Sequence, residues 1–223
     1  MLSKNIFQII IVGTGSYVCG KKEKEYGTIL PAVLTYAKKF SCEIQITFAC
    51  NSEQGKLNAV KKISQLIKLI DVEKFIKVEY ILCQGDPEVF FDSFNKKSIL
   101  ASIVSVPDEF HFKWISSMLR REIITLSVKP LTLELADSQY LFNLSQQKRT
   151  PLFVEFHKRY DRQLRFARDT FNAGKLGIPL YSYTEYTQRK EIPLKSFSSW
   201  CEKTNIFSYL GVHYVDAMLF ITR

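Results

Sequence analysis

The sequence predicts an α/β protein, because short β-rich segments alternate with segments of helical periodicity along most of its 223 residues. The first β-rich segment ends in a Gly-x-Gly turn at Gly13 and Gly15. A later segment, Ile99 to Val106, is almost continuously apolar, which is typical of a strand buried on both faces of a parallel sheet. These features predict a Rossmann-type, doubly wound parallel sheet, followed by a partial α+β second domain.

The predicted elements of the first part follow one another in βαβ order. The strands are Phe7 to Val12, Glu43 to Ala49, Val78 to Cys83, Ile99 to Val106 and Glu122 to Val128. The helices are Thr28 to Phe40, Leu57 to Ile70, a short one after Gly85-Asp86-Pro87, Asp108 to Arg121 and Thr132 to Lys148. Residues 1–130 are therefore predicted to form a dinucleotide-binding Rossmann domain.

Residues 131–223 are predicted to form a crossover helix and a truncated α+β domain that serves substrate binding or oligomerisation. After the crossover helix we expect a strand from Pro151 to Phe156, a helix from Asp161 to Asn172, a strand from Pro179 to Thr187 and a helix from Phe207 to Phe220. The chain then stops at Arg223. A second sheet of two or three strands would keep an open edge, which favours homo-oligomers through that sheet.

Composition limits the classes of function. At 46% hydrophobic residues the chain can bury a core, and its apolar runs are too short to cross a bilayer. The net charge of +9 comes largely from lysine and arginine pairs on helix faces, which indicates a solvated surface and not a nucleic-acid site. Five scattered cysteines argue against disulfides and against a metal site. We expect a cytoplasmic protein with reduced thiols and no membrane or nucleic-acid partner.

The glycine turn departs from the usual G-x-G-x-x-G pattern. Val18 stands where the pattern has its third glycine. Residues Tyr17 to Tyr26, which include Val18, form a charged insertion. Gly27, after the insertion, can take over the third glycine's packing role. The lysines of the insertion would either fold over an anionic cofactor or lie in solvent. We expect the turn to bind a dinucleotide through Gly13, Gly15 and Ser16; the alternative is a purely structural turn.

The end of the second strand bears on the choice of cofactor. An acidic residue there binds the ribose hydroxyls of NAD. This strand ends at Asn51 and Ser52, with Glu53 following and Lys56 nearby. Asn and Ser beside a lysine accommodate a 2′-phosphate better, which favours NADP, whereas Glu53 keeps NAD open.

Four segments occur in a fixed order: SIVSVPDEFH, SVKPLTLELADSQYLFNLSQQ, EFHKRYDRQLRFARDTFNAGKLGIP and YLGVHYVD. Together they resemble the Gfo/Idh/MocA oxidoreductases, the family of glucose-fructose oxidoreductase and inositol dehydrogenase, over almost the whole chain, with an apparently shortened C-terminus. The resemblance implies hydride transfer between NAD(P) and a CH–OH carbon of a sugar, sugar nucleotide or cyclitol, and so a small sugar-like substrate.

The resemblance also implies residue roles. Val106 and Pro107 match the bend beside the cofactor, and Lys129 matches the lysine that approaches the nicotinamide and the reacting oxygen. Arg159 and Tyr160 fall in the substrate-side segment. His213 and Asp216 match the family's histidine and final aspartate. Two positions depart from the pattern, because Val128 replaces a glutamate and Tyr209 replaces the leading aspartate.

The implied chemistry suits these residue types. Oxidation of an alcohol needs a base that titrates near neutrality, as histidine does, and a cation that stabilises developing negative charge, as lysine does. Tyr209 would share a helix face with His213 and could relay a proton. Each residue also has a structural interpretation: Lys129 as a strand-end lysine, and His213 as a satisfied core histidine. Three hypotheses follow: an NAD(P)-dependent oxidoreductase, a non-catalytic dinucleotide-binding relic, and a basic interaction module.

Overall fold

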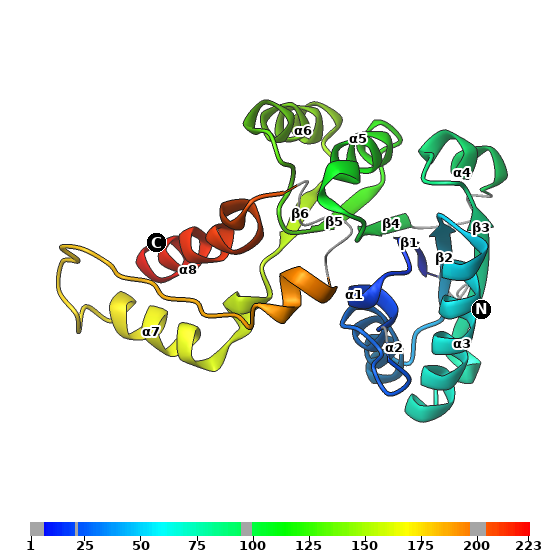
Figure 1. Cartoon of the computed structure of the whole chain (residues 1–223), viewed down its shortest axis with the longest axis horizontal. Helices are drawn as coiled ribbons and strands as arrows, with labels where there is room; N and C mark the ends of the chain where they lie inside the picture. Colours follow the sequence, from blue (N-terminus) through cyan, green and yellow to red (C-terminus); the bar gives the residue numbers. More distant parts are fainter. Residues whose placement is uncertain (1–6, 21, 95–99, 197–203) are drawn as a thin grey trace, which may run out of the picture.

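A six-stranded parallel sheet lies at the centre of the structure, a computed structural model that describes residues 7–20, 22–94, 100–196 and 204–223. The strand order is β3-β2-β1-β4-β5-β6, and every neighbouring pair is parallel (Figure 1). The strands are β1 (Phe7–Val12), β2 (Ile44–Cys50), β3 (Ile76–Leu82), β4 (Leu100–Val104), β5 (Ile124–Val128) and β6 (Leu152–Glu155). The predicted Rossmann-type, doubly wound sheet is confirmed.

Helices cover both faces of the sheet. One face packs against α2 (Ile29–Phe40) and α3 (Glu53–Ile70), and the other against α4 (Pro87–Ser93), α5 (His111–Arg120) and α6 (Leu135–Lys148) (Figure 1). Every residue of β2 is buried, including the polar Gln45 and Thr47, because helices cover both faces of the sheet. The two apolar layers together make one core with the sheet in its middle. Among the largest buried side chains are Phe48, Leu34, Phe90 and Trp114.

Local sequence explains the helix starts. Ser52 caps α3, since its hydroxyl accepts a hydrogen bond from the Gly55 N–H. Asp86 caps α4 in the same way, and Pro87 occupies the first turn of that helix. The helix expected from Asp108 is divided, because a 3₁₀ turn, η2 (Asp108–Phe110), precedes α5. A second 3₁₀ turn, η1 (Glu73–Phe75), leads into β3.

The strand expected to open the second domain belongs to the first sheet. β6 pairs in parallel with β5, from Thr125 opposite Leu152 to Val128 opposite Glu155. The helix α6 is the crossover between these two strands. The sheet therefore extends past the predicted boundary at residue 130, because β6 completes its hydrogen bonds on the free edge of β5.

Beyond β6 the described residues form helices and turns. These are the 3₁₀ turn η3 (His157–Tyr160), α7 (Arg162–Asn172), the wide helical turns η4 (Ile192–Ser196) and η6 (Phe207–Gly211), and α8 (Val212–Thr222). The helices α7 and α8 lie side by side, away from the sheet (Figure 1). The Arg168 guanidinium lies 4.8 Å from the Phe220 ring centroid, which joins the two helices.

The predicted strand over residues 179–187 is wrong. These residues are extended but pair with no strand in the described part of the chain. Leu180, Tyr181 and Tyr183 are all highly exposed, so the apolar side chains do not pack on one face. An alternating pattern forms a strand only where a neighbour accepts its hydrogen bonds, and no such neighbour lies beside this segment.

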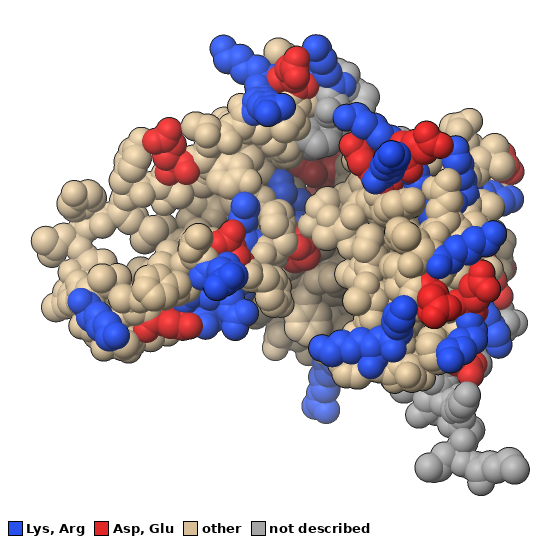
Figure 2. Space-filling model, turned by 90° about the horizontal axis from the view of Figure 1, so that it is seen from below, with Lys and Arg blue, Asp and Glu red and all other residues tan. Residues whose placement is uncertain are grey.

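Helix hydrophobicity, the cysteines and the surface charges can be compared with what the composition predicts. None of the described helices has the length and apolar character of a membrane span. Cys19, Cys42, Cys50 and Cys83 are free, whereas Cys201 lies outside the described residues. On the face shown in Figure 2, Lys and Arg side chains are interspersed with Asp and Glu. That face carries no single continuous basic patch.

Candidate active site

The chain turns sharply after β1, where the strand order reverses between β1 and β4. Gly13 has a φ of +102°, and a Cβ atom there would lie 2.1 Å from the carbonyl oxygen of Ser105, in the loop after β4. Glycine alone tolerates both this conformation and this close approach. The carboxyl ends of β1 and β4 therefore border the crevice in which open parallel sheets bind ligands.

Gly15 and Ser16 lie at the start of a one-turn helix, α1 (Ser16–Cys19). Gly15 is exposed, and a Cβ atom on it would meet nothing within 4 Å. Open space beside exposed backbone is what a close approach of the dinucleotide pyrophosphate requires. The residues present thus fit a dinucleotide, with Gly13 making the turn and Gly15 leaving the space.

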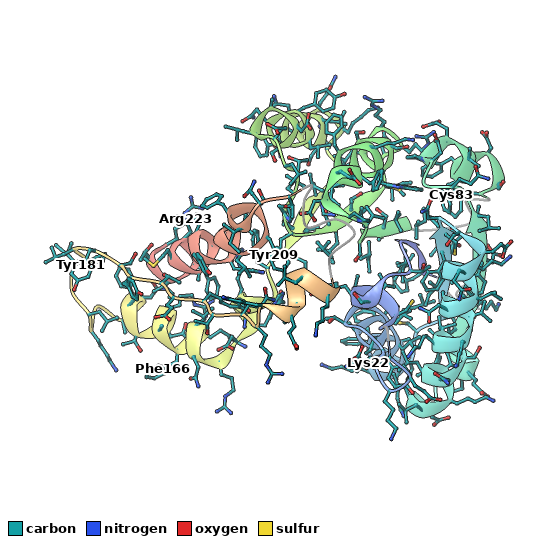
Figure 3. The ribbon with its side chains drawn as sticks, in the orientation of Figure 1. Lys22, Cys83, Phe166, Tyr181, Tyr209 and Arg223 are labelled. Atoms are coloured by element: carbon teal, nitrogen blue, oxygen red, sulfur yellow. The ribbon has the colours of Figure 1, made fainter. Side chains whose placement is uncertain are left out.

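The insertion folds back on itself. Val18 and Cys19 of α1 are buried, and the chain returns so closely that a Cβ atom on Gly27 would lie 2.6 Å from the Tyr17 carbonyl oxygen. Gly27, with a φ of +68°, thus permits close packing, although it packs against α1 and not against the strand. The Lys22 side chain lies in solvent (Figure 3), and its ammonium lies 3.7 Å from the Glu25 carboxylate.

A buried lysine from α3 fixes the insertion. The Lys62 side chain reaches the carbonyl oxygens of Lys22, Glu23 and Glu25, the last two at 3.0 and 2.7 Å. Its ammonium also lies 5.1 Å from the Tyr26 ring centroid. Lys62 is only 2% exposed, so these groups replace the water that its charge would otherwise bind. The insertion is therefore anchored to α3.

The end of β2 lies beside the glycine turn. A Cβ atom on Gly55 would lie 2.6 Å from the Thr14 hydroxyl oxygen, so α3 begins close to the turn. The Asn51 amide oxygen faces Gly85, in the loop after β3. The Ser52 hydroxyl caps α3, and Glu53 pairs with Lys56 at 3.8 Å. A ligand reaching this end would meet a capping hydroxyl, an amide and a partly neutralised carboxylate.

A buried histidine, for which the sequence suggested no partner, joins the loops after β4 and β5. The His111 ring is completely buried, with Nδ1 2.7 Å from the Pro130 carbonyl oxygen and Nε2 3.0 Å from the Val106 carbonyl oxygen. It fixes the bend at Val106 to the residue that follows Lys129. Val106 also borders the glycine turn, since its Cγ1 atom would lie 3.4 Å from a Cβ atom on Gly13. Pro107, next to Val106, is exposed at this edge.

Lys129 and Tyr209 are in direct contact. The Lys129 ammonium donates to the Tyr209 carbonyl oxygen at 2.6 Å and lies 4.4 Å from that ring's centroid. Burial lowers the pKa of Lys129, and the nearby charges of Asp108 and Glu155 oppose this effect. Burial raises the pKa of Asp108, whose carboxylate accepts a hydrogen bond from Thr204 at 3.2 Å. Figure 3 shows Tyr209 between the α7–α8 pair and the sheet.

His213 is enclosed by aromatic rings. It is 6% exposed, and the rings of Phe156, His157 and Tyr186 lie 6.3, 5.2 and 6.3 Å from its own. Its Nδ1 atom is buried and has no hydrogen-bond partner among the described residues. The pKa of His213 is lowered from 6.5 to about 4. Burial of the ring is the main cause, and the positive charge of Lys129 is the second. A histidine with this pKa is neutral at pH 7.

Two of the substrate-side residues satisfy each other. The Arg159 guanidinium and the buried Asp216 carboxylate form a two-pronged ion pair, with Nε–Oδ distances of 3.1 and 3.0 Å. This pair joins η3 to α8. Tyr160 is 80% exposed. The structure thus brings Lys129, Tyr209 and His213 together, pairs Arg159 with Asp216 beside them, and leaves the Tyr160 side chain in solvent.

The contact of Tyr17, in the insertion after the glycine turn, with Glu155 and His157 was not predicted from the sequence. The Tyr17 hydroxyl donates to Glu155 Oε2 at 3.0 Å, and Glu155 Oε1 lies 3.6 Å from His157 Nδ1. Burial, together with the Glu155 charge, raises the pKa of Tyr17. Tyr17 and Glu155 are 138 positions apart, so no local pattern could reveal the contact. No group of three potential metal ligands occurs among the described residues.

The sheet and its crevice are those of a Rossmann-type α/β protein, and several solved structures share this fold. Scyllo-inositol dehydrogenase from Lactobacillus casei, with bound NAD(H) and scyllo-inositol, matches 97% of this chain with a TM-score of 0.64 and 19% identity. The WlbA (WbpB) dehydrogenase from Thermus thermophilus, in complex with NAD and α-ketoglutarate, matches 98% with a TM-score of 0.63 and 14% identity. A myo-inositol dehydrogenase from Corynebacterium glutamicum matches 97% with a TM-score of 0.61 and 15% identity.

These likenesses concern the fold. The chain covers 56%, 63% and 55% of those three proteins, so it spans little more than half of their length. No protein-family model and no curated protein matches the sequence. The structural neighbours are nevertheless dehydrogenases of the kind that the Gfo/Idh/MocA resemblance implies, and the fold expected from that resemblance is confirmed.

Proposed function

We propose that the protein is an NAD(P)-dependent oxidoreductase that transfers hydride between nicotinamide and a CH–OH carbon of a sugar, sugar nucleotide or cyclitol. The main support is the glycine turn, since Gly13 packs on the loop after β4 while Gly15 leaves open space above α1. The solved structures with the same fold include dehydrogenases with bound NAD. A bound nicotinamide would supply the hydride acceptor, and Val106, Pro107 and Lys129 lie at the edge that would hold it.

In this proposal the substrate meets Lys129 and His213. The Lys129 ammonium stabilises negative charge on the reacting oxygen, and neutral His213 accepts the hydroxyl proton through its unpartnered Nδ1. Tyr209 supports Lys129 and can relay a proton through its hydroxyl. Arg159, Tyr160 and Asp216 are assigned to the substrate side, where the first and last hold η3 against α8.

Several finer assignments belong to the same proposal. Asn51 and Ser52, with Lys56 nearby, favour NADP over NAD, and the Glu53–Lys56 pair weakens the carboxylate that would reject a 2′-phosphate. Residues 1–130 supply the cofactor site, and residues 131–223 supply the substrate side. We place the protein in the cytoplasm as part of a homo-oligomer.

The alternative is a non-catalytic dinucleotide-binding relic of such an enzyme. Specific observations favour it: Lys129 is engaged by a backbone carbonyl, and the pKa of His213 is about 4. A base with so low a pKa accepts a proton weakly at neutral pH. Bound cofactor and substrate would have to raise that pKa for the site to turn over.

The test is a titration of the purified protein with NADPH and NADH, followed by nicotinamide fluorescence and thermal stability. Gly15→Arg fills the open space and should abolish saturable binding. Gly15→Ala is the matched control, because the Gly15 φ of −71° suits alanine, and it should stay folded with a smaller loss of affinity. Failure of the unaltered, folded protein to bind either cofactor would reject both the oxidoreductase and the relic. Binding without turnover across sugars and cyclitols would leave the relic.

A further inference from the structure

The candidate base His213 is closed off from solvent. Its Nδ1 atom is buried and has no hydrogen-bond partner among the described residues, although a neutral imidazole nitrogen that carries no proton is a good acceptor. A substrate hydroxyl would satisfy it but cannot reach it past the surrounding rings. At least one of the groups packed on His213 must therefore move before a ligand binds there.

Three described rings surround His213, and two of them are held in place by the end of the sheet and the turn that follows it. Phe156 and His157 follow β6 directly and lie in or beside η3, whose turn is closed by the Arg159 N–H to Phe156 carbonyl bond at 3.0 Å. The Arg159–Asp216 ion pair also fixes η3 to α8, the helix that carries His213. Moving either ring would break the end of the sheet or this buried pair.

The third ring belongs to a loosely attached segment. Residues 179–189, called the strap below, form neither helix nor strand, and within the described chain residues 179–188 make no backbone–backbone hydrogen bond. Leu180 of the strap is 92% exposed, whereas Tyr186 is 36% exposed because its ring lies nearly parallel to the His213 ring, at 17°. Tyr181, near the outer end of the strap, extends into solvent (Figure 3).

In the described part of the chain, the strap is held by hydrogen bonds and ring contacts that each involve a side chain. The Tyr214 hydroxyl donates to the Tyr186 carbonyl oxygen at 3.2 Å, and the Gln188 amide donates to the Tyr209 hydroxyl at 3.1 Å. The Lys158 ammonium lies 5.3 Å from the Tyr186 ring centroid. Such contacts can break without disturbing the sheet or the helices.

We propose that the strap is a cover over His213, and that Tyr186 swings away to admit a hydroxyl-bearing ligand to His213 Nδ1. Tyr186 is thereby a positioning and gating residue, not a catalytic one. The inference rests on the proposed function for the role of His213, but its test requires neither cofactor nor turnover.

Diethyl pyrocarbonate, which acylates neutral imidazole nitrogens, tests the cover when mass spectrometry reports the rate at each histidine near neutral pH. The sequence has three histidines. His157, with a side chain 44% exposed, should react fast, and buried His111, bonded at both nitrogens, should react slowly. His213 should react slowly in the unaltered protein.

In Tyr186→Ala the rate at His213 should rise by about tenfold, since the stacked ring contact is lost. Tyr214→Phe and Gln188→Ala remove the two hydrogen bonds of the strap and should give smaller increases; they decide the question if Tyr186→Ala does not fold. Tyr183→Ala, an exposed tyrosine of the same strap, is the matched control and should leave the rate unchanged.

The proposal is overturned if His213 reacts as fast in the unaltered protein as His157, or if no folded strap variant raises its rate. NADPH and NADH titrations of the same variants keep this outcome separate from the proposed function. Faster modification of His213 in a protein that binds no cofactor would support the strap and reject the oxidoreductase. Normal cofactor binding with no change in the modification rate of His213 would support the oxidoreductase and reject the strap.

Discussion

The two buried histidines differ in their hydrogen bonding. His111 lies within hydrogen-bond distance of a carbonyl oxygen at each ring nitrogen. His213 has no hydrogen-bond partner at Nδ1 among the described residues. The first ring holds two loops together, and the second retains capacity for a ligand. Residue type alone did not distinguish these two roles.

Replacement of His111 by phenylalanine should destabilise the protein by about 2–4 kcal/mol, because the fully buried ring loses its hydrogen bonding to the Pro130 and Val106 carbonyl oxygens. The free energy of unfolding from urea titration measures the change. His157→Phe, at a partly exposed histidine, is the control and should change the value by less than about 0.5 kcal/mol. Equal effects of the two substitutions would contradict a bridging role for His111.

The low pKa of His213 predicts acid sensitivity. The unfolded ring takes up its proton near pH 6.5 and the folded ring near pH 4, so the unfolded state binds more protons between these values. Stability is therefore retained above pH 6.5 and is lost as pH falls toward 4, by up to about 3 kcal/mol from this group. Urea titrations across that window should show a flatter pH dependence in His213→Asn. An unchanged slope would refute the depressed pKa.

Among the elements, the insertion after the glycine turn is the main departure from a simple βαβ unit. It forms α1 and a return turn, and Lys62 of α3 binds three of its carbonyl oxygens. The Tyr17 hydroxyl, at its start, reaches Glu155 at the end of β6. The insertion therefore connects the cofactor turn with the segment that leads to His157.

Loss of the Lys62 ammonium should release the insertion. Lys62→Met should speed amide hydrogen exchange over residues 22–26 and reduce stability by about 1–3 kcal/mol, because three carbonyl oxygens lose a charged donor. Hydrogen exchange followed by mass spectrometry measures the first effect. Lys61→Met, at the exposed neighbouring lysine, provides the control. Unchanged exchange in Lys62→Met would show that the insertion is held by its own packing.

Elements that bury continuous apolar runs could be predicted from the sequence, and those that depend on distant partners could not. β4 was expected within two residues because its segment is almost continuously apolar, and β2 was expected within one residue from its β-rich segment. α1 was missed, since one turn carries no periodicity. The strand predicted over residues 179–187 does not form, because no described strand lies beside this segment to accept its hydrogen bonds. At the site, Lys129 and His213 followed from the resemblance, whereas Glu155 and Tyr186 contribute through contacts across the fold.

For the molecule as a whole, exposed apolar side chains are concentrated on the part beyond the sheet. No residue of α7 is buried, and Phe166 on this helix lies outward (Figure 3). Ile178 and Leu180 of the following segment are also exposed. A patch of this kind commonly marks an interaction surface. The expected second-domain sheet does not form in the described residues, so we expect these exposed apolar side chains, and not a sheet edge, to mediate self-association.

We therefore expect concentration-dependent self-association, measured by sedimentation equilibrium over a range of loading concentrations. The double variant Ile178→Glu and Leu180→Glu should shift the protein toward monomer, because burying a carboxylate in a contact costs more than the contact returns. Leu135→Glu is the control, since Leu135 is 84% exposed but lies at the start of α6, far along the chain from the patch. A single monomeric species for the unaltered protein at every concentration, or an equal shift in the control, would exclude this surface as the interface.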